Sequence, residues 1–132
     1  MLSIELLKKY PEQYYKQLCE LNNSNQNISD ILNEQVYESW YGTHLHCLCC
    51  LVGKLEPKYD EEDCLLTGFY GYGYNISNEL GIKILNEMIR GGIDINIKDY
   101  YDMTVNTKLN TNLLTTRVDN IPFKENIEKL YD

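Results

Sequence analysis

The chain has 132 residues, a formal net charge of −8 and a hydrophobic fraction of 43%. This length suits one domain, and this apolar content excludes a generally disordered chain. No stretch approaches the roughly 18 consecutive apolar residues of a membrane span, and the acidic balance without a basic cluster argues against nucleic acid and anionic membrane as partners. The first residues lack the basic and apolar segments of a secretory signal, so we expect an intracellular, cytoplasmic protein.

The use of cysteine and alanine adds two inferences. The five cysteines, an odd number with three crowded at 47, 49 and 50, do not fit a secreted disulfide framework. Alanine is absent, whereas Asn, Ile, Lys and Tyr are heavily used. That bias is expected from an AT-rich genome, and a large DNA virus is one candidate source. A viral origin would place the protein in the host cytoplasm.

The first part of the chain has helical patterns. Residues 3–21 are predicted to be helical, with Pro11 at the first position of a helix, where its missing N–H costs nothing. A polar, Asn-rich break follows at 22–27. Ser29 is then the predicted N-cap of a helix over about 30–40. The apolar face of that helix would consist of Ile31, Leu32, Val36 and Trp40.

The centre of the chain combines a short apolar run with a long loop. The run from Leu45 to Val52 is either a buried strand or a short buried helix, because periodicity alone does not separate the two. Residues 53–76 are predicted to form a surface loop. Its acidic run at 60–63 lacks the ligand pattern of a calcium loop, and its Gly-Tyr segment at 68–74 does not match the dinucleotide-binding fingerprint.

The clearest helix is predicted over residues 79–90, with Asn78 or Ser77 as its cap and Gly91-Gly92 at its end. A turn is expected at 99–102, and a last helix after Pro122. The inward-facing residues would be Ile82, Leu85, Met88 and Ile89 in the first of these helices and Phe123, Ile127 and Leu130 in the second.

Two stretches of the chain resemble the ankyrin-repeat family. Thr43-His44-Leu45-His46 resembles the T-P-L-H opening of a repeat, with His44 in place of the proline. The segment 84–96, which ends in Gly-Gly-Ile-Asp-Ile-Asn, resembles the second helix of a repeat and its exit into a hairpin. Asp99 and Thr104 resemble the opening of a further repeat, in which Asp102 takes a glycine position.

The resemblance implies roles for particular residues. Thr43 would cap the first helix of the repeat, and the histidine of the motif, His46, would bridge backbone groups of neighbouring repeats. The glycine at the end of the second helix would supply a positive φ. Thr43 precedes Asp94 by 51 residues, which is too long for a repeat of about 33. An insertion of roughly 28 residues must therefore separate the two helices, and it matches the loop at 53–76.

The predicted fold is therefore mainly α, an ankyrin-like helical repeat in a single domain over residues 1–132. It would consist of irregular N-terminal helices at 1–41, one repeat unit with a long inserted loop at 42–98, and a degenerate repeat with a capping helix at 99–132. Because about three repeats are needed for stability, the N-terminal helices should supply a packing partner for the central unit.

A His/Cys cluster is the best candidate for chemistry. Zinc takes four Cys or His ligands in a tetrahedron, and the candidate set is His46, Cys47, Cys50 and Cys64. The competing interpretation is packing, because cysteine behaves as a small hydrophobic residue in a chain without alanine. Nothing in the sequence marks a lowered thiol pKa for a nucleophile. We expect packing, with no cofactor and no enzymatic activity, and keep a zinc site as the alternative.

Tyrosines are the candidate partner-binding residues, since tyrosine offers rigid amphipathic contact area. Tyr100 and Tyr101 at the predicted hairpin tip are the better candidates, because hairpin tips bind partners in ankyrin repeats, and Tyr70 and Tyr72 in the insertion are the second pair. The predicted function is a non-catalytic protein–protein interaction module. A structural subunit of a larger assembly and a small zinc-binding protein are the alternatives, and the oligomeric state stays open.

Overall fold

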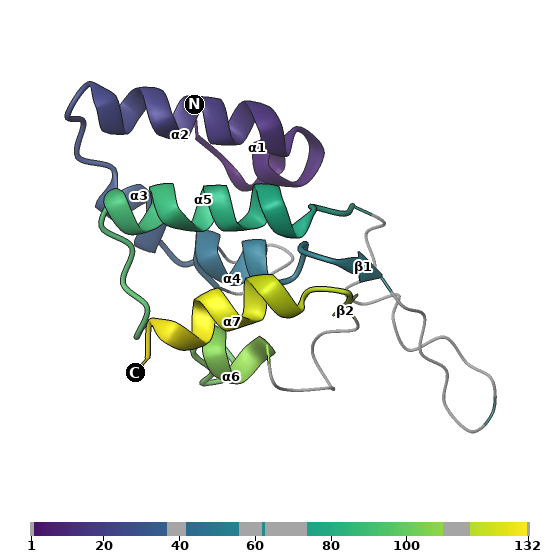
Figure 1. The fold of residues 1–132 in the computed structure, drawn as a ribbon. Helices are drawn as coiled ribbons and strands as arrows, with labels where there is room; N and C mark the ends of the chain where they lie inside the picture. The colour runs from purple at the N-terminus through teal and green to yellow at the C-terminus, as the bar shows by residue number, and fades with distance from the viewer. Residues whose placement is uncertain (1, 37–41, 56–61, 63–73, 110–116, 132) are drawn as a thin grey trace.

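The computed structural model describes residues 2–36, 42–55, 62, 74–109 and 117–131, and these residues are mainly helical, as predicted (Figure 1). The elements in chain order are α1 (Ile4–Lys9), α2 (Pro11–Asn23), α3 (Ser29–Asn33), α4 (His44–Cys49), β1 (Lys54–Leu55), α5 (Asn78–Arg90), α6 (Val105–Leu109), β2 (Arg117–Val118) and α7 (Ile121–Lys129).

Six of the helices form three stacked pairs. Helix α1 packs on α2, α4 on α5, and α6 on α7. The first helices of the pairs, α1, α4 and α6, contact one another in that order, and so do the second helices, α2, α5 and α7, which lie one beneath another in Figure 1. The short helix α3 packs on α4. Each pair buries its apolar face against the next pair, which is how helical repeats build a continuous core.

The three first helices begin in the same way. A hydroxyl oxygen at the N-cap accepts a hydrogen bond from the backbone N–H three residues on, at 3.1 Å for Ser3 and at 3.4 Å for Thr43 and for Thr104. This bond satisfies a donor that the first turn of a helix otherwise leaves unpaired. The second helices α2 and α7 instead carry Pro11 and Pro122 in the first turn, where a missing N–H costs nothing.

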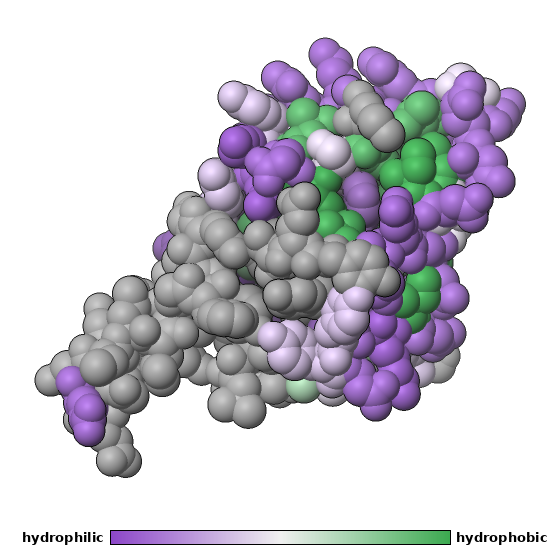
Figure 2. Space-filling model, turned by 180° about the vertical axis from the view of Figure 1, so that it is seen from behind, coloured by the Kyte–Doolittle hydropathy of each residue, from purple (hydrophilic) through white to green (hydrophobic). Residues whose placement is uncertain are grey.

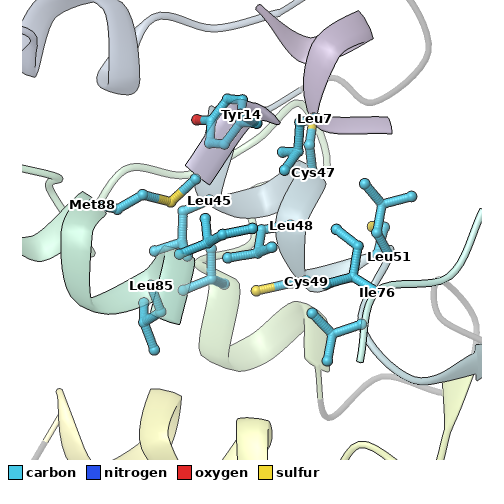
Figure 3. Packing of buried hydrophobic residues seen from close by; sticks show 14 of the residues in the cluster. Leu7, Tyr14, Leu45, Cys47, Leu48, Cys49, Leu51, Ile76, Leu85 and Met88 are labelled. Carbon is cyan, nitrogen blue, oxygen red and sulfur yellow. The ribbon is translucent and has the colours of Figure 1, made fainter. Parts of the chain in front are cut away.

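The core lies between the two layers of helices and is centred on α4. Every residue of α4 is buried. Figure 3 shows Leu45 and Leu48 of this helix among side chains from α1, α2 and α5. The predicted run at 45–52, which left strand and helix open, is therefore a buried helix in its first part. The fully or nearly fully buried apolar residues of the other helices include Leu7, Tyr14, Leu18, Leu32, Ile84, Leu85, Met88, Phe123 and Ile127.

The end of α5 follows the pattern expected from its glycines. Gly92 has a φ of +93°, a conformation that costs glycine little. The N–H of Ile93 donates to the carbonyl of Met88 at 3.0 Å, and the N–H of Gly92 donates to that of Ile89 at 3.1 Å. These two bonds form the Schellman motif that ends many helices.

Two details of the predicted helices are wrong. The helix expected over 30–40 ends at Asn33, and Ser29 is its first residue rather than its cap, which is Ile28. Val36 instead forms an antiparallel bridge with Gly42, because the chain must turn back to reach the cap of α4, and Trp40 lies outside the described residues.

The inward stripe of α5 is also shifted. Ile89 is 41% exposed and Ile82 is half-buried. The buried residues of this helix are Gly81, Ile84, Leu85 and Met88. Helix α5 packs between α2 and α7, and a Cβ on Gly81 would come within 2.7 Å of a Val52 methyl group. The buried face of α5 therefore includes a glycine, packed closely against Val52, where the prediction named Ile82 and Ile89.

The base of the long insertion is built from short extended segments. Val52 and Ile76 form a parallel bridge, which brings the two ends of the insertion together. Strand β1, inside the stretch predicted as a loop, pairs antiparallel with β2, so that Lys54 lies opposite Val118. This pairing joins the connection between α4 and α5 to the connection between α6 and α7. The acidic run and the Gly-Tyr segment lie outside the described residues, apart from the exposed Glu62 and from Tyr74 at the end of the Gly-Tyr segment.

Candidate functional site

Two segments that precede first helices lie side by side, and we call residues 28–36 and 91–103 together the hairpin edge. The Asn33 side chain donates from Nδ2 to the carbonyl of Gly92 at 3.0 Å and accepts at Oδ1 from the N–H of Asp94 at 2.7 Å. The Gln35 side chain donates from Nε2 to the carbonyl of Lys98 at 2.7 Å. Side chains of the first segment thus bind the backbone of the second and fix their relative position.

The tip of the second segment is a turn built around Asp99. This buried carboxylate accepts at Oδ1 from the N–H groups of Tyr101, at 2.8 Å, and Met103, at 3.1 Å. Aspartate closes turns in this way, by bonding its own backbone a few residues on. Asp102, predicted at a glycine position, has a φ of +60°, which aspartate tolerates better than most residues.

The tyrosines predicted at this tip are exposed. Tyr100 is 58% and Tyr101 is 41% accessible to solvent. The turn that carries them is held by backbone and Asp99 bonds, so the two rings are presented on a fixed support. Tyr70 and Tyr72, the other predicted pair, lie outside the described residues.

His46 connects α4 to the end of the hairpin edge. Its Nδ1 accepts from the N–H of Thr43 at 3.1 Å, so its Nε2 carries the proton and donates to the carbonyl of Met103 at 3.0 Å. The ring thereby bridges the cap of one helix and the residue before the cap of the next, Thr104. Such a bridge is the role that the sequence resemblance implied for this histidine. A zinc ligand would need one of these two nitrogens.

The cysteines at 47, 49 and 50 lie in the buried hydrophobic core. Cys47 is fully buried and Cys50 nearly so, and both carry thiols rather than disulfides. They are spaced as a Cys-x-x-Cys pair, but no three His, Cys, Asp or Glu side chains gather within the described residues as a metal site would require. Cys64, the fourth predicted ligand, lies outside these residues.

His44, in the position of the motif's proline, is buried against α2. Its Nδ1 shares a hydrogen bond of 2.7 Å with the hydroxyl of Tyr14, and burial lowers its pKa to about 4. Burial also raises the pKa of Tyr14 well above its ordinary value. Both groups are therefore neutral at pH 7. The pair joins the first two helix pairs through their buried interior.

Arg117 is a structural centre that sequence reasoning missed. It is only 7% exposed. Its guanidinium donates from Nε to the carbonyl of Cys50 at 2.8 Å, from Nη2 to that of Tyr74 at 2.6 Å, and from Nη1 to the side chain of Asn75. Burial lowers the pKa of this group. Arg117 thus ties the end of α4 to the returning end of the insertion, and no local pattern around it could have indicated this.

The hairpin edge and the layer of second helices differ in charge. Within residues 28–36 and 91–103 the acidic residues are Asp30, Glu34, Asp94, Asp99 and Asp102, and Lys98 is the one cation. On the second helices acidic and basic side chains interleave, as Glu12, Lys16 and Glu20 on α2, Glu79, Lys83, Glu87 and Arg90 on α5, and Lys124, Glu125, Glu128 and Lys129 on α7. The hairpin edge is thus more acidic than the layer of second helices.

A hollow at the first helix pair is the other candidate surface. It has a volume of about 490 Å³ and lies between the N-terminal segment, α2 and α3, with Leu2, Leu21, Ile28 and Ile31 as its apolar lining. Hydrophobic atoms reach the surface in the upper part of the view in Figure 2, at the level of that pair, while most of the coloured surface elsewhere is hydrophilic. Leu2 and Ile28 in this lining are buried, and Leu21 and Ile31 are partly exposed.

Comparison of the chain with protein-family models, with curated proteins and with solved structures found no significant match in any of the three. Among the described residues, none of the helices combines the length and the apolar character that crossing a bilayer requires.

Proposed function

We propose that this chain is a non-catalytic protein-interaction module of ankyrin-like type, which binds a protein partner through its hairpin edge. The observation that carries the proposal is the His46 bridge. The ring accepts from the N–H of Thr43, which caps α4, and donates to the carbonyl of Met103, which precedes α6 and its cap. A device of this kind ties one repeat to its successor, and it has no evident use in a helical bundle without repeats.

Three further features support the ankyrin-like assignment. The helices stack as three pairs, and a Ser or Thr hydroxyl caps each first helix. Gly92 and Asp102 supply positive φ at the exit of a second helix and in the hairpin turn. The number of pairs matches the roughly three units that a repeat array needs to bury its faces. The helices at the N-terminus then constitute the first unit.

The hairpin edge is proposed as the binding surface because it presents exposed aromatic side chains on a rigid turn. Tyrosine and arginine dominate the energetics of protein interfaces, and a surface that is already ordered loses little entropy on binding. Tyr100 and Tyr101 meet both conditions, since the Asp99 bonds fix their backbone. The hydrogen bond from Gln35 to the carbonyl of Lys98 keeps the two segments together.

The test is capture of a partner from cells that express the chain, followed by measurement of its affinity. Partners identified by mass spectrometry with the wild-type chain are purified and titrated against Tyr100→Ala/Tyr101→Ala. We expect this double variant to lose at least tenfold in affinity, as removal of two interface tyrosines commonly does. The backbone bonds of the turn do not involve these side chains, so the fold should persist.

Tyr10→Ala is the matched control. Tyr10 is 58% exposed, like Tyr100, and lies at the corner between α1 and α2, away from the hairpin edge. Its removal should leave affinity within about twofold of wild type. Equal losses for the control and the double variant, or unchanged binding by the double variant with an intact circular-dichroism spectrum, would remove the hairpin edge as the binding surface.

A further inference from the structure

We infer that the partner presents a positively charged segment, bearing arginine or lysine side chains, to the hairpin edge. This inference rests on the proposed function and names the chemistry of its partner. Two independent properties of the edge carry it: the placement of its carboxylates and the exposure of its aromatic rings.

The carboxylates flank the tip on both of its segments. Glu34 follows α3 on the first segment, and Asp94 and Asp102 lie before and after the tyrosines on the second, all three exposed. Lys98 lies 3.5 Å from the Asp102 carboxylate and offsets part of one charge. The hydrogen bonds that Asn33 donates to the Gly92 carbonyl and accepts from the Asp94 N–H hold these carboxylates on one edge.

This charge excess distinguishes the edge from the layer of second helices. On α5, Glu79 lies 3.8 Å from Lys83 and Glu87 lies 3.0 Å from Arg90, so that the carboxylates have cations as neighbours. A uniformly acidic protein would attract basic molecules over its whole surface. Between these two surfaces the hairpin edge should attract basic molecules more strongly, because clustered charge of one sign raises the local concentration of the opposite sign.

The tyrosine rings add a second attraction for the same groups. A guanidinium or ammonium group placed over an aromatic face is held by the ring quadrupole, and arginine forms this contact most often. Tyr100 and Tyr101 provide two exposed rings between the carboxylates. An arginine side chain on this edge could contact a ring with its flat face and a carboxylate with its N–H donors.

One further group on the edge needs a donor. The Oε1 atom of Gln35 is buried and has no hydrogen-bond partner among the described residues, while its Nε2 donates to the carbonyl of Lys98. Leaving a buried acceptor unpaired costs free energy, and a donor that reached this oxygen would recover that free energy. Arginine and lysine side chains carry only donors, so they can donate to this oxygen as well as to the carboxylates.

The test uses a defined probe rather than an unknown ligand. A fluorescein-labelled peptide of six alternating arginine–glycine pairs is titrated with the purified full chain at low and at high salt, with fluorescence anisotropy as the readout. A glutamate–glycine peptide of equal length is the negative probe. We expect the arginine peptide to bind and the glutamate peptide not to bind.

Two variants of equal net charge make the experiment specific. Glu34→Gln/Asp94→Asn/Asp102→Asn neutralises the edge and keeps side-chain shape, including the Asp94 oxygen that accepts from Asn96 and a residue that tolerates the positive φ at 102. Glu12→Gln/Glu125→Gln/Glu128→Gln neutralises three exposed carboxylates on α2 and α7 instead. Circular dichroism confirms that both variants fold.

The edge variant should weaken binding of the arginine peptide about tenfold, and the control less than twofold, since each exposed ion pair contributes a few-fold at most. Tyr100→Ala/Tyr101→Ala should weaken it further, through loss of the ring contacts. Equal losses for the edge and control variants would mean that the peptide responds only to net charge, and would overturn the inference.

The captured partner separates this inference from the proposed function. If Tyr100→Ala/Tyr101→Ala abolishes partner binding while the charge-neutralised edge binds it normally, the edge is a binding surface and the basic segment is wrong. If neither variant changes partner binding, the proposed function itself fails. Loss of partner binding by both variants, with the control unchanged, is the result that we expect.

Discussion

We call the buried side chains of His44, His46 and Arg117 the seam beneath α4. Polar groups in this seam and polar groups on the hairpin edge differ in their surroundings. In the seam, the polar groups of His44, His46 and Arg117 are buried and hydrogen-bonded across helix pairs. On the edge, the tyrosines and the carboxylates of Glu34, Asp94 and Asp102 are exposed, and the buried carboxylate of Asp99 holds the turn. Buried polar groups are costly to leave unpaired, whereas exposed ones contribute little to stability.

The difference indicates how the molecule separates stability from recognition. Substitutions in the seam should unfold the chain or loosen its stack, and substitutions on the edge should alter binding without altering the fold. Three predictions test this division, beginning with the largest expected change in the free energy of unfolding.

Arg117→Met should cost the most. The methionine keeps an apolar stem but leaves the carbonyls of Cys50 and Tyr74 without the donors that Arg117 supplies. Each buried acceptor that loses its partner costs about 1–3 kcal/mol, so we expect a loss of about 3 kcal/mol in the free energy of unfolding. Urea titration followed by circular dichroism measures it.

Arg90→Met is the control for this substitution. Arg90 is also paired, with Glu87 at 3.0 Å, but it is exposed on α5. An exposed ion pair contributes no more than about 1 kcal/mol. If the two methionine variants lost the same stability, the guanidinium at the base of the insertion would not be the anchor that its hydrogen bonds indicate.

Acid should weaken the seam through His44. Burial lowers the pKa of His44 in the folded chain to about 4, below the value near 6.5 of an unfolded chain. The unfolded state therefore binds a proton more readily, so the contribution of His44 is fully present above pH 6.5 and is lost as the pH falls from about 6.5 to about 4. The shift corresponds to a loss of up to about 3 kcal/mol over that range.

A variant identifies the source of that loss. His44→Gln removes the titration while keeping a polar group near the Tyr14 hydroxyl, so the variant should be less stable than wild type at pH 7 and should lose less stability between pH 6.5 and 4. Urea unfolding at a series of pH values gives both slopes. Parallel slopes for the two proteins would show that other groups cause the acid sensitivity.

Local signals explain what the sequence could predict. The boundaries of α5 are set by the Ser77 hydroxyl and by Gly91-Gly92, all within one turn of the helix ends. The last helix begins at Ile121, beside Pro122 and slightly earlier than predicted. The His46 bridge was implied by the resemblance of residues 43–46 to a repeat opening. Its contact with Thr43 is local, whereas its contact with Met103 spans 57 residues and has no local signal.

The misplaced features depend on distant parts of the chain. The apolar spacing at 30–40 is helical, but the need to return to Thr43 ends α3 at Asn33. Arg117 gives no signal in its own neighbourhood, because its partners Cys50, Tyr74 and Asn75 precede it by 67, 43 and 42 residues. The acidic composition was evident from the start, but the fold was needed to show that carboxylates of residues 28–36 and 91–103 share one edge.

The smallest expected change in stability belongs to the hairpin edge itself. Tyr100→Ala/Tyr101→Ala should change the free energy of unfolding by less than about 0.5 kcal/mol, since the rings are exposed and the turn is closed by the carboxylate of Asp99. Asp99→Ala, on the same turn, removes both of those bonds and should cost about 1–2 kcal/mol. Urea unfolding of the two variants places the boundary between the parts of the edge that hold the fold and the parts that face a partner. A loss for the double tyrosine variant as large as that for Asp99→Ala would mean that the rings pack as part of the core, and the separation of stability from recognition would not hold at this tip.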